Sequence, residues 1–238
     1  MTDTDRLFAD PPAREARFVV KQKWSEMGNF ADDDPLKDAE FLHRQMNEEI
    51  NSIEMCARNL ADFPDADWEL RMEIARQCWD EARHAVAFRN LMQTRGGRVG
   101  QFPIMNFQYR IVTALKSLAS RLTVQNRSFE AAGLDAIQTG IDSSARKQDP
   151  EFVALFEQQL ADEMQHVRYA NSWIKVLMRR GGPRSVFELA RDVSQANEAL
   201  RVVAGDAILF YPVVDELRRE AGFTDDEIES ARSLTAAE

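Results

Sequence analysis

Two copies of a Glu-x-x-His motif, Glu81 to His84 and Glu163 to His166, constrain this chain more than any other feature of its sequence. On an α-helix, residues three positions apart lie on the same face, one turn apart. Each motif therefore directs a carboxylate and an imidazole toward one point. One such motif arises by chance in many helices, whereas two spaced copies predict a helical fold with an internal repeat.

A further glutamate precedes each motif at nearly the same distance, Glu49 before Glu81 and Glu130 before Glu163. Both of these glutamates fall within segments of helical spacing. The duplication predicts that one side chain from each of four helices, with the two histidines, converges on a single site. The candidate catalytic and metal-binding residues are Glu49, Glu81, His84, Glu130, Glu163 and His166.

Hydrophobic spacing predicts four long helices, near residues 34–62, 67–93, 107–147 and 150–180. Asp34-Pro35 and Asp149-Pro150 are typical helix starts, because Asp caps a helix and Pro suits its first position. Gly133 is the expected position of a kink in the third helix. Glycines and a proline at 181–183 are expected to end the fourth.

Shorter helices are expected near 185–203, 206–220 and 225–234, the last opened by a capping box at Thr224 and Glu227. No segment has the alternation of a β-strand, so the predicted fold class is all-α. The one long link, between the second and third helices, favours a four-helix bundle with a single crossover. We expect an N-terminal extension at 1–33, the bundle at 34–183, and C-terminal helices packed on it at 184–238.

The formal net charge of −10 disfavours a nucleic-acid partner, because phosphate backbones are bound by basic surfaces. No apolar run reaches the roughly 18 residues of a membrane span, so no membrane partner is expected. The cysteines, Cys56 and Cys78, do not suggest a disulfide framework. Because the N-terminus also lacks a secretory signal, a cytoplasmic location is predicted.

The charge of the glutamates in the candidate site indicates that the site binds cations. Four carboxylates on inward helix faces would be costly as bare charges, since burial and mutual repulsion both disfavour ionisation. Two divalent cations would balance them. Oxygen-rich ligation with one imidazole for each metal suits iron or manganese better than a thiolate-binding metal. Two Fe ions per chain are expected, with Mn or a mixed Mn/Fe pair as alternatives.

Residues next to the ligands are candidates for orienting them. Asp80 and Asp162 each precede a motif glutamate, and metal-bound histidines commonly donate their second N–H to a carboxylate. The alternative is that both are ordinary surface acids. An amide also lies four residues before each proposed glutamate ligand, where it either orients that ligand, lines a pocket, or simply fills space. These amides are Gln45, Gln77, Asn126 and Gln159.

The ligand of the first helix has competitors in Glu48 and Glu54. Glu49 is favoured by its spacing and by its parallel with Glu130, each having a small residue one turn later. His43 faces another side of the helix and is not an expected ligand.

At these residues the sequence resembles the ferritin-like superfamily of di-iron carboxylate proteins, and more closely a bacterial ferritin-like family of mostly unknown function. The segments that carry this likeness are 62–65, 68–73, 75–84, 102–106 and 124–130. The form Asp-Glu-x-Arg-His also resembles the metal motif of bacterial multicomponent monooxygenases, although Gln165 replaces Arg in the second copy. The resemblance implies two metal ions on the six candidate ligands, and no particular substrate.

The expected function is an O2-activating di-iron oxidase or oxygenase acting on a small organic molecule, with an electron donor as partner. The segments 1–33 and 184–238 favour it, because a minimal storage bundle needs neither. They would cover the site or form homo-oligomer contacts. The alternatives are a bacterioferritin-like ferroxidase, a manganese catalase-like enzyme, and a non-catalytic helical interaction module.

Overall fold

The computed structural model describes residues 16–28, 30–31, 33–143, 148–204 and 211–236. This part of the chain is mostly helical with almost no strand, which confirms the all-α class. It divides into two compact units. Of the described residues, those up to 116 and those at 195–204 form the first unit, and the remainder form the second.

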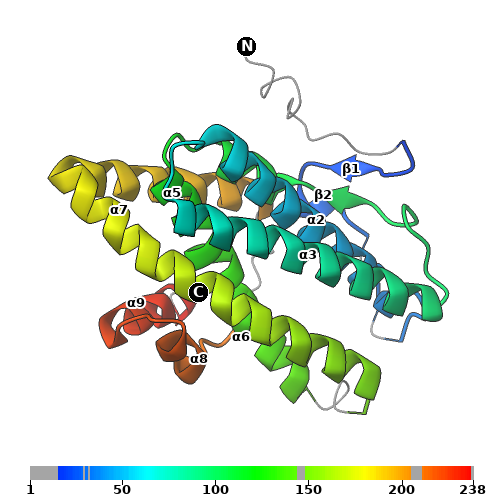
Figure 1. The fold of residues 1–238 in the computed structure, drawn as a ribbon. Coiled ribbons are helices and arrows are strands. Elements are labelled where there is room, and N and C mark those ends of the chain that lie inside the picture. Colours follow the sequence, from blue (N-terminus) through cyan, green and yellow to red (C-terminus); the bar gives the residue numbers. More distant parts are fainter. Residues whose placement is uncertain (1–15, 29, 32, 144–147, 205–210, 237–238) are drawn as a thin grey trace. The chain divides into compact units, whose positions relative to one another are not determined.

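A pair of helices forms the body of the first unit. Helices α2 (Lys37–Asp62) and α3 (Trp68–Thr94) pack side by side along their length (Figure 1). The turn between them is held by Arg71, whose guanidinium donates hydrogen bonds to the carbonyl oxygens of Leu60 and Phe63 at 2.9 and 2.8 Å. Both helices lie within a few residues of their predicted ranges.

The N-terminal segment and the segment after α3 pair as two short strands, a feature that the sequence did not predict. Strands β1 (Val20–Lys21) and β2 (Ile104–Met105) are parallel. The carbonyl oxygen of Met105 accepts hydrogen bonds from the side chains of Asn47 and Asn51 on α2, at 2.6 and 3.1 Å. These bonds fix the crossover segment to the helix pair. A short 3-10 helix (Trp24–Glu26) follows β1.

The expected continuous helix over 107–147 is interrupted, and this prediction was wrong. Helix α4 (Phe107–Ala114) ends where Leu115 is extended, with φ −75° and ψ 140°. The helix restarts in the second unit as α5 (Leu118–Leu122), because the side chain of Ser117 accepts a hydrogen bond from the Ser120 amide.

A π-helix, η2 (Thr123–Glu130), follows α5 and continues into α6 (Ala131–Asp142). The predicted kink at Gly133 is therefore misplaced, since the irregular turn precedes that glycine and α6 runs through it. Residues 144–147, which the prediction also included, lie outside the described residues.

Helix α7 (Pro150–Ala204) begins at the predicted Asp149-Pro150 start, where the Asp149 side chain accepts from the Phe152 amide at 3.2 Å. Its helical geometry breaks at Gly182, whose φ of 69° favours glycine. The predicted stop at 181–183 is thus a break, after which the helix resumes. Residues 150–194 of α7 belong to the second unit and residues 195–204 to the first.

The core of the second unit joins α6, α7 and the C-terminal segment. Its buried residues are Ala131, Leu134, Met164, Val167 and Ala221. Helices α6 and α7 approach closely at Gly140, where an added Cβ would lie 2.7 Å from the Phe156 ring. This glycine therefore sets the spacing of the two helices at that point.

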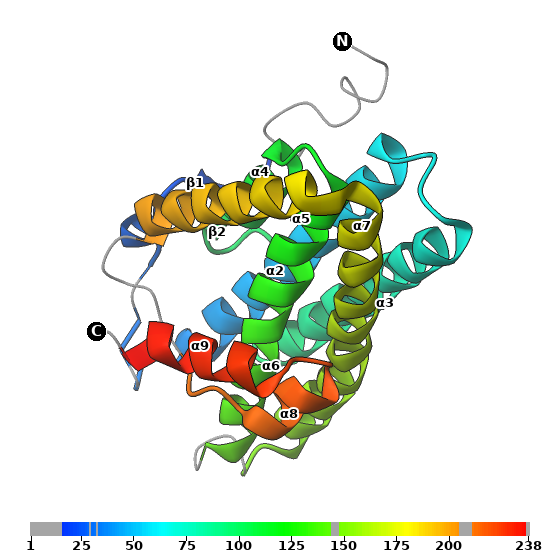
Figure 2. The ribbon, with the colours of Figure 1, turned by 90° about the vertical axis from the view of Figure 1, so that its left-hand side faces the viewer.

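Two short helices, α8 (Asp215–Glu220) and α9 (Asp225–Ala236), close the second unit beside α6 (Figure 2). The capping box predicted for α9 is confirmed: the Thr224 amide donates to the Glu227 carboxylate at 2.8 Å, and the Glu227 amide donates to Thr224 Oγ1 at 3.3 Å. The Asn171 side chain on α7 donates to the Ala221 carbonyl at 2.7 Å. Helix α8 was predicted to begin near residue 206 and begins at Asp215. Residues 206–210 lie outside the described residues.

None of the helices described by the structure combines the length and the apolar character that crossing a membrane requires.

Candidate metal centre

In the first unit, one glutamate and one histidine of α3 meet a glutamate of α2. His84 Nδ1 lies 3.3 Å from Glu49 Oε2 and 3.3 Å from Glu81 Oε2. All three side chains are buried, and each offers one ligand atom within 4.8 Å of the other two. The turn spacing of the motif places Glu81 and His84 on one face of α3, and the packing of α2 against α3 supplies Glu49.

An amide supports this first cluster. Gln77, one turn before Glu81 and buried, donates a hydrogen bond from Nε2 to Glu81 Oε1 at 2.8 Å. This contact fixes one carboxylate oxygen, while the other, Oε2, faces His84. Gln77 is thus bonded to a proposed ligand, and its role in orienting a metal ligand stays a prediction.

Gln45 differs from Gln77, although the two were predicted together. Its amide donates to Glu48 Oε2 at 3.0 Å. Glu48 also lies 3.7 Å from Arg44, and burial raises its pKa above the ordinary value. Of the two neighbouring glutamates on α2, Glu48 is therefore engaged with its own helix and Glu49 joins the cluster.

In the second unit, the equivalent residues come from the π-helix and α7. His166 Nδ1 lies 3.0 Å from Glu163 Oε2, and Glu130 offers an oxygen within 4.8 Å of both ligand atoms. All three side chains are buried. The Asn126 amide donates to the backbone carbonyl of His166 at 3.3 Å, which ties η2 to α7 at this point. The second cluster therefore repeats the composition of the first.

Glu130 is the last residue of the π-helix, a feature that sequence reasoning missed. Segments of π-helix are rare and occur frequently at functional sites. Here the wide turn includes Asn126 and ends on a proposed ligand, so it sets the direction of both side chains. No glycine or proline in 123–130 signals it, and the apolar spacing there is compatible with an ordinary α-helix.

The acids before the motif glutamates have different surroundings. Asp80 is buried and forms ion pairs on its own helix with Arg83 and, at 3.6 Å, with Arg76. Asp162 is half-buried on α7, and Gln159 is buried one turn before Glu163. Their proposed roles beside the metal ligands remain predictions.

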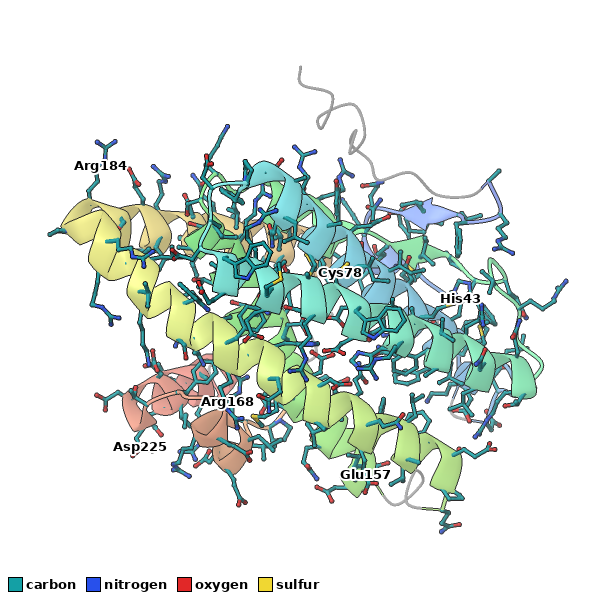
Figure 3. All side chains as sticks on the ribbon, in the orientation of Figure 1. His43, Cys78, Glu157, Arg168, Arg184 and Asp225 are labelled. Atoms are coloured by element: carbon teal, nitrogen blue, oxygen red, sulfur yellow. The ribbon has the colours of Figure 1, made fainter. Side chains whose placement is uncertain are left out.

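His43 lies on α2 (Figure 3) and is not among the residues grouped in either cluster. Its Nε2 accepts a hydrogen bond from the Gly100 amide at 2.9 Å, and its ring packs against those of Phe18 and Phe102. Burial lowers its pKa from 6.5 to about 4. This histidine holds the crossover segment against α2.

The donor sets suit a hard or borderline divalent cation. Each cluster offers two carboxylates and one imidazole, all buried, and the His Nδ1 atom faces the carboxylate of its own motif. Buried carboxylates gathered this closely repel one another unless a cation or proton joins them. Oxygen ligands with a single imidazole are typical of iron and manganese sites.

A protein-family comparison matches residues 2–229 to a family described as "Protein of unknown function (DUF455)". Neither the curated proteins nor the solved structures contain a match to this chain. Because the matched residues span nearly the whole sequence, the chain belongs to the DUF455 family.

Proposed function

We propose that this protein is an O2-activating di-iron oxidase or oxygenase acting on a small organic substrate, with one iron ligated by each cluster. The observation that carries the proposal is the repetition of one buried donor set, two glutamates and a histidine, in both units. A ferritin-like four-helix bundle that combines α2 and α3 with η2–α6 and α7 is part of this proposal and rests on the sequence.

Charge supports two divalent ions. The four glutamates, Glu49, Glu81, Glu130 and Glu163, would carry a charge of about −4 when ionised, which two divalent ions would cancel. A reduced iron pair would supply the electrons with which O2 is activated.

The protein's own residues would hold the ligands in place and keep water away. Gln77 fixes one oxygen of Glu81, so that the other is directed at His84. Asn126 holds the backbone of His166 to the π-helix. Burial of all six ligands excludes bulk water, which strengthens electrostatic interactions at the site.

The additional segments favour an enzyme over a minimal iron-storage bundle. The first unit carries β1 and its contacts with the crossover, and the second carries α8 and α9. We expect such segments to restrict access to the ligands, as selective chemistry on an organic substrate requires.

Metal analysis and O2 uptake test the proposal. Wild-type protein from its native host should bind about two irons per chain, and Glu81→Gln and Glu163→Gln should each lose metal. The matched control is Glu157→Gln, since Glu157 is exposed on α7 (Figure 3) and should leave the metal content unchanged.

The chemically reduced wild-type protein should consume O2 and develop an oxidised di-iron absorption. Unchanged metal content in both ligand variants would reject the ligand assignment. Rapid O2 release from peroxide by manganese-loaded protein would instead identify a catalase, and formation of a large iron-filled assembly would identify a ferroxidase.

A further inference from the structure

An apolar stripe runs along the solvent-facing side of α3. Trp68 and Trp79 are 69% and 66% exposed, and Met72 and Val86 are 43% and 45% exposed. The partly exposed Ala75 and Ala82 lie between them. Large exposed aromatic side chains in one row are unusual on a surface that contacts only water.

The spacing of the stripe is that of a coiled-coil seam. Its members are separated by four and three residues in strict alternation: Trp68, Met72, Ala75, Trp79, Ala82 and Val86. A 3.5-residue repeat is the pattern with which one helix packs along another. The stripe spans roughly 27 Å of helix, since each residue rises about 1.5 Å.

The order of side-chain sizes makes the stripe complementary to a second copy of the same helix. An antiparallel copy related by a two-fold axis at the level of Gln77 brings residues equally distant from Gln77 opposite one another. Large side chains then face small ones: Trp79 faces Ala75 of the second copy, and Met72 faces Ala82. Trp68 faces Val86 in the same way.

Charges beside the stripe agree with this arrangement. The exposed Glu69 has no ion-pair partner among the residues that the structure describes. In the antiparallel pair Glu69 lies opposite residue 85 of the second copy, two residues from Arg83. The two-fold axis repeats this opposite-charge contact once. Arg83 already forms an ion pair with Asp80 of its own helix, so the contact with Glu69 would be a second one. Arg76, which approaches its own symmetry mate, is likewise paired with Asp80, at 3.6 Å.

We propose that the protein forms a homodimer in which the Trp68–Val86 faces of two α3 helices pack antiparallel about a two-fold axis. Four tryptophan rings would be buried, each able to bury roughly 150–250 Å². The face lies on the outer side of α3 and uses neither Glu81 nor His84, so the proposal stands independently of the metal assignment.

Sedimentation of the full chain tests the dimer. Wild-type protein should sediment as a dimer in the micromolar range, and Trp79→Glu should sediment as a monomer with an unchanged circular dichroism spectrum. The control is Phe187→Glu, because Phe187 is 77% exposed on α7 and lies off the stripe. A monomeric wild type, or a dimeric Trp79→Glu protein, would overturn the proposal.

Charge reversal at Glu69 tests the contact between copies. Glu69→Arg should weaken the dimer more than Glu69→Gln does, because it places a like charge near Arg83 of the second copy, and both variants leave the Arg83–Asp80 pair in place. Equal dissociation constants for the two variants would contradict the pairing.

Spin labels test the direction of the helices. With Cys56→Ala and Cys78→Ala removing the native thiols, a label at Arg76→Cys should lie near its symmetry mate. A label at Arg89→Cys should lie roughly 36 Å from its mate, because each Arg89 is twelve residues from the axis. Short distances at both positions would indicate a parallel pair and overturn the arrangement.

Discussion

Asp135 on α6 and Arg218 on α8 form a buried ion pair, with Arg218 Nη2 2.6 Å from Asp135 Oδ2. The other Asp135 oxygen accepts a hydrogen bond from the Val214 amide at 2.9 Å, directly before α8. The Asp135 carboxylate thus accepts hydrogen bonds from both a side chain and a backbone amide at the start of the C-terminal helices.

We expect Asp135→Ala to lower the free energy of unfolding by about 3–5 kcal/mol, because it leaves Arg218 as an uncompensated buried charge. Denaturant unfolding measures the loss. Arg219→Ala is the control, since Arg219 is exposed and its ion pairs with Asp215 and Asp225 are screened by water and should contribute little. Equal losses in the two variants would contradict a structural role for the buried pair.

His43 should make stability depend on pH. Its pKa is about 4 when folded and 6.5 as an ordinary group, so the unfolded chain binds the proton more readily. Its contribution to stability is complete above pH 6.5 and is lost as the pH falls toward 4.

The comparison variant is His43→Gln, which keeps an acceptor for the Gly100 amide without the titration. Urea midpoints between pH 4 and 7 should fall more steeply for the wild type than for the variant. Parallel profiles would show that His43 does not titrate with unfolding.

Two glycines of α6 should respond oppositely to alanine. At Gly140 a Cβ would lie 2.7 Å from the Phe156 ring, so Gly140→Ala should destabilise the fold by about 1–3 kcal/mol. At Gly133 nothing lies within 4 Å, so Gly133→Ala should stabilise it by about 0.5–1 kcal/mol through helix propensity. Thermal unfolding midpoints would reveal the difference, and shifts of the same sign would refute the packing argument.

Gln77 and Gln45 test whether an amide orients a metal ligand. Gln77→Ala should weaken metal binding about 10–100-fold, because Gln77 holds Glu81. Gln45→Ala should leave affinity unchanged, since Gln45 bonds to Glu48. Competition with a chelator measures both affinities, and equal losses would show that Gln77 has no special role.

The sequence predicted features that local signals determine. Helix α3 begins and ends within one residue of its predicted bounds, because proline and aspartate precede it and Gly96-Gly97 follow it. The motif spacing likewise indicated that Glu81 and His84 would share a face, as they do.

Features that depend on distant partners were missed. The pairing of Val20 with Ile104 needs two segments far apart in the sequence, and neither has strand alternation. The break at Leu115 lies in a segment that lacks proline and glycine, and its local signal is Ser117, the N-cap of the next helix. The sequence alone does not show whether Gln45 bonds to Glu48 or to the adjacent Glu49, and in the structure it bonds to Glu48.

Helix α3 places Glu81 and His84 on one side and Trp79 on another, without a break from Trp68 to Thr94. An inserted or deleted residue within this stretch would rotate all later positions by about 100°. Both faces would then lose register at once, so related chains should vary here by substitution and keep the length of this helix fixed.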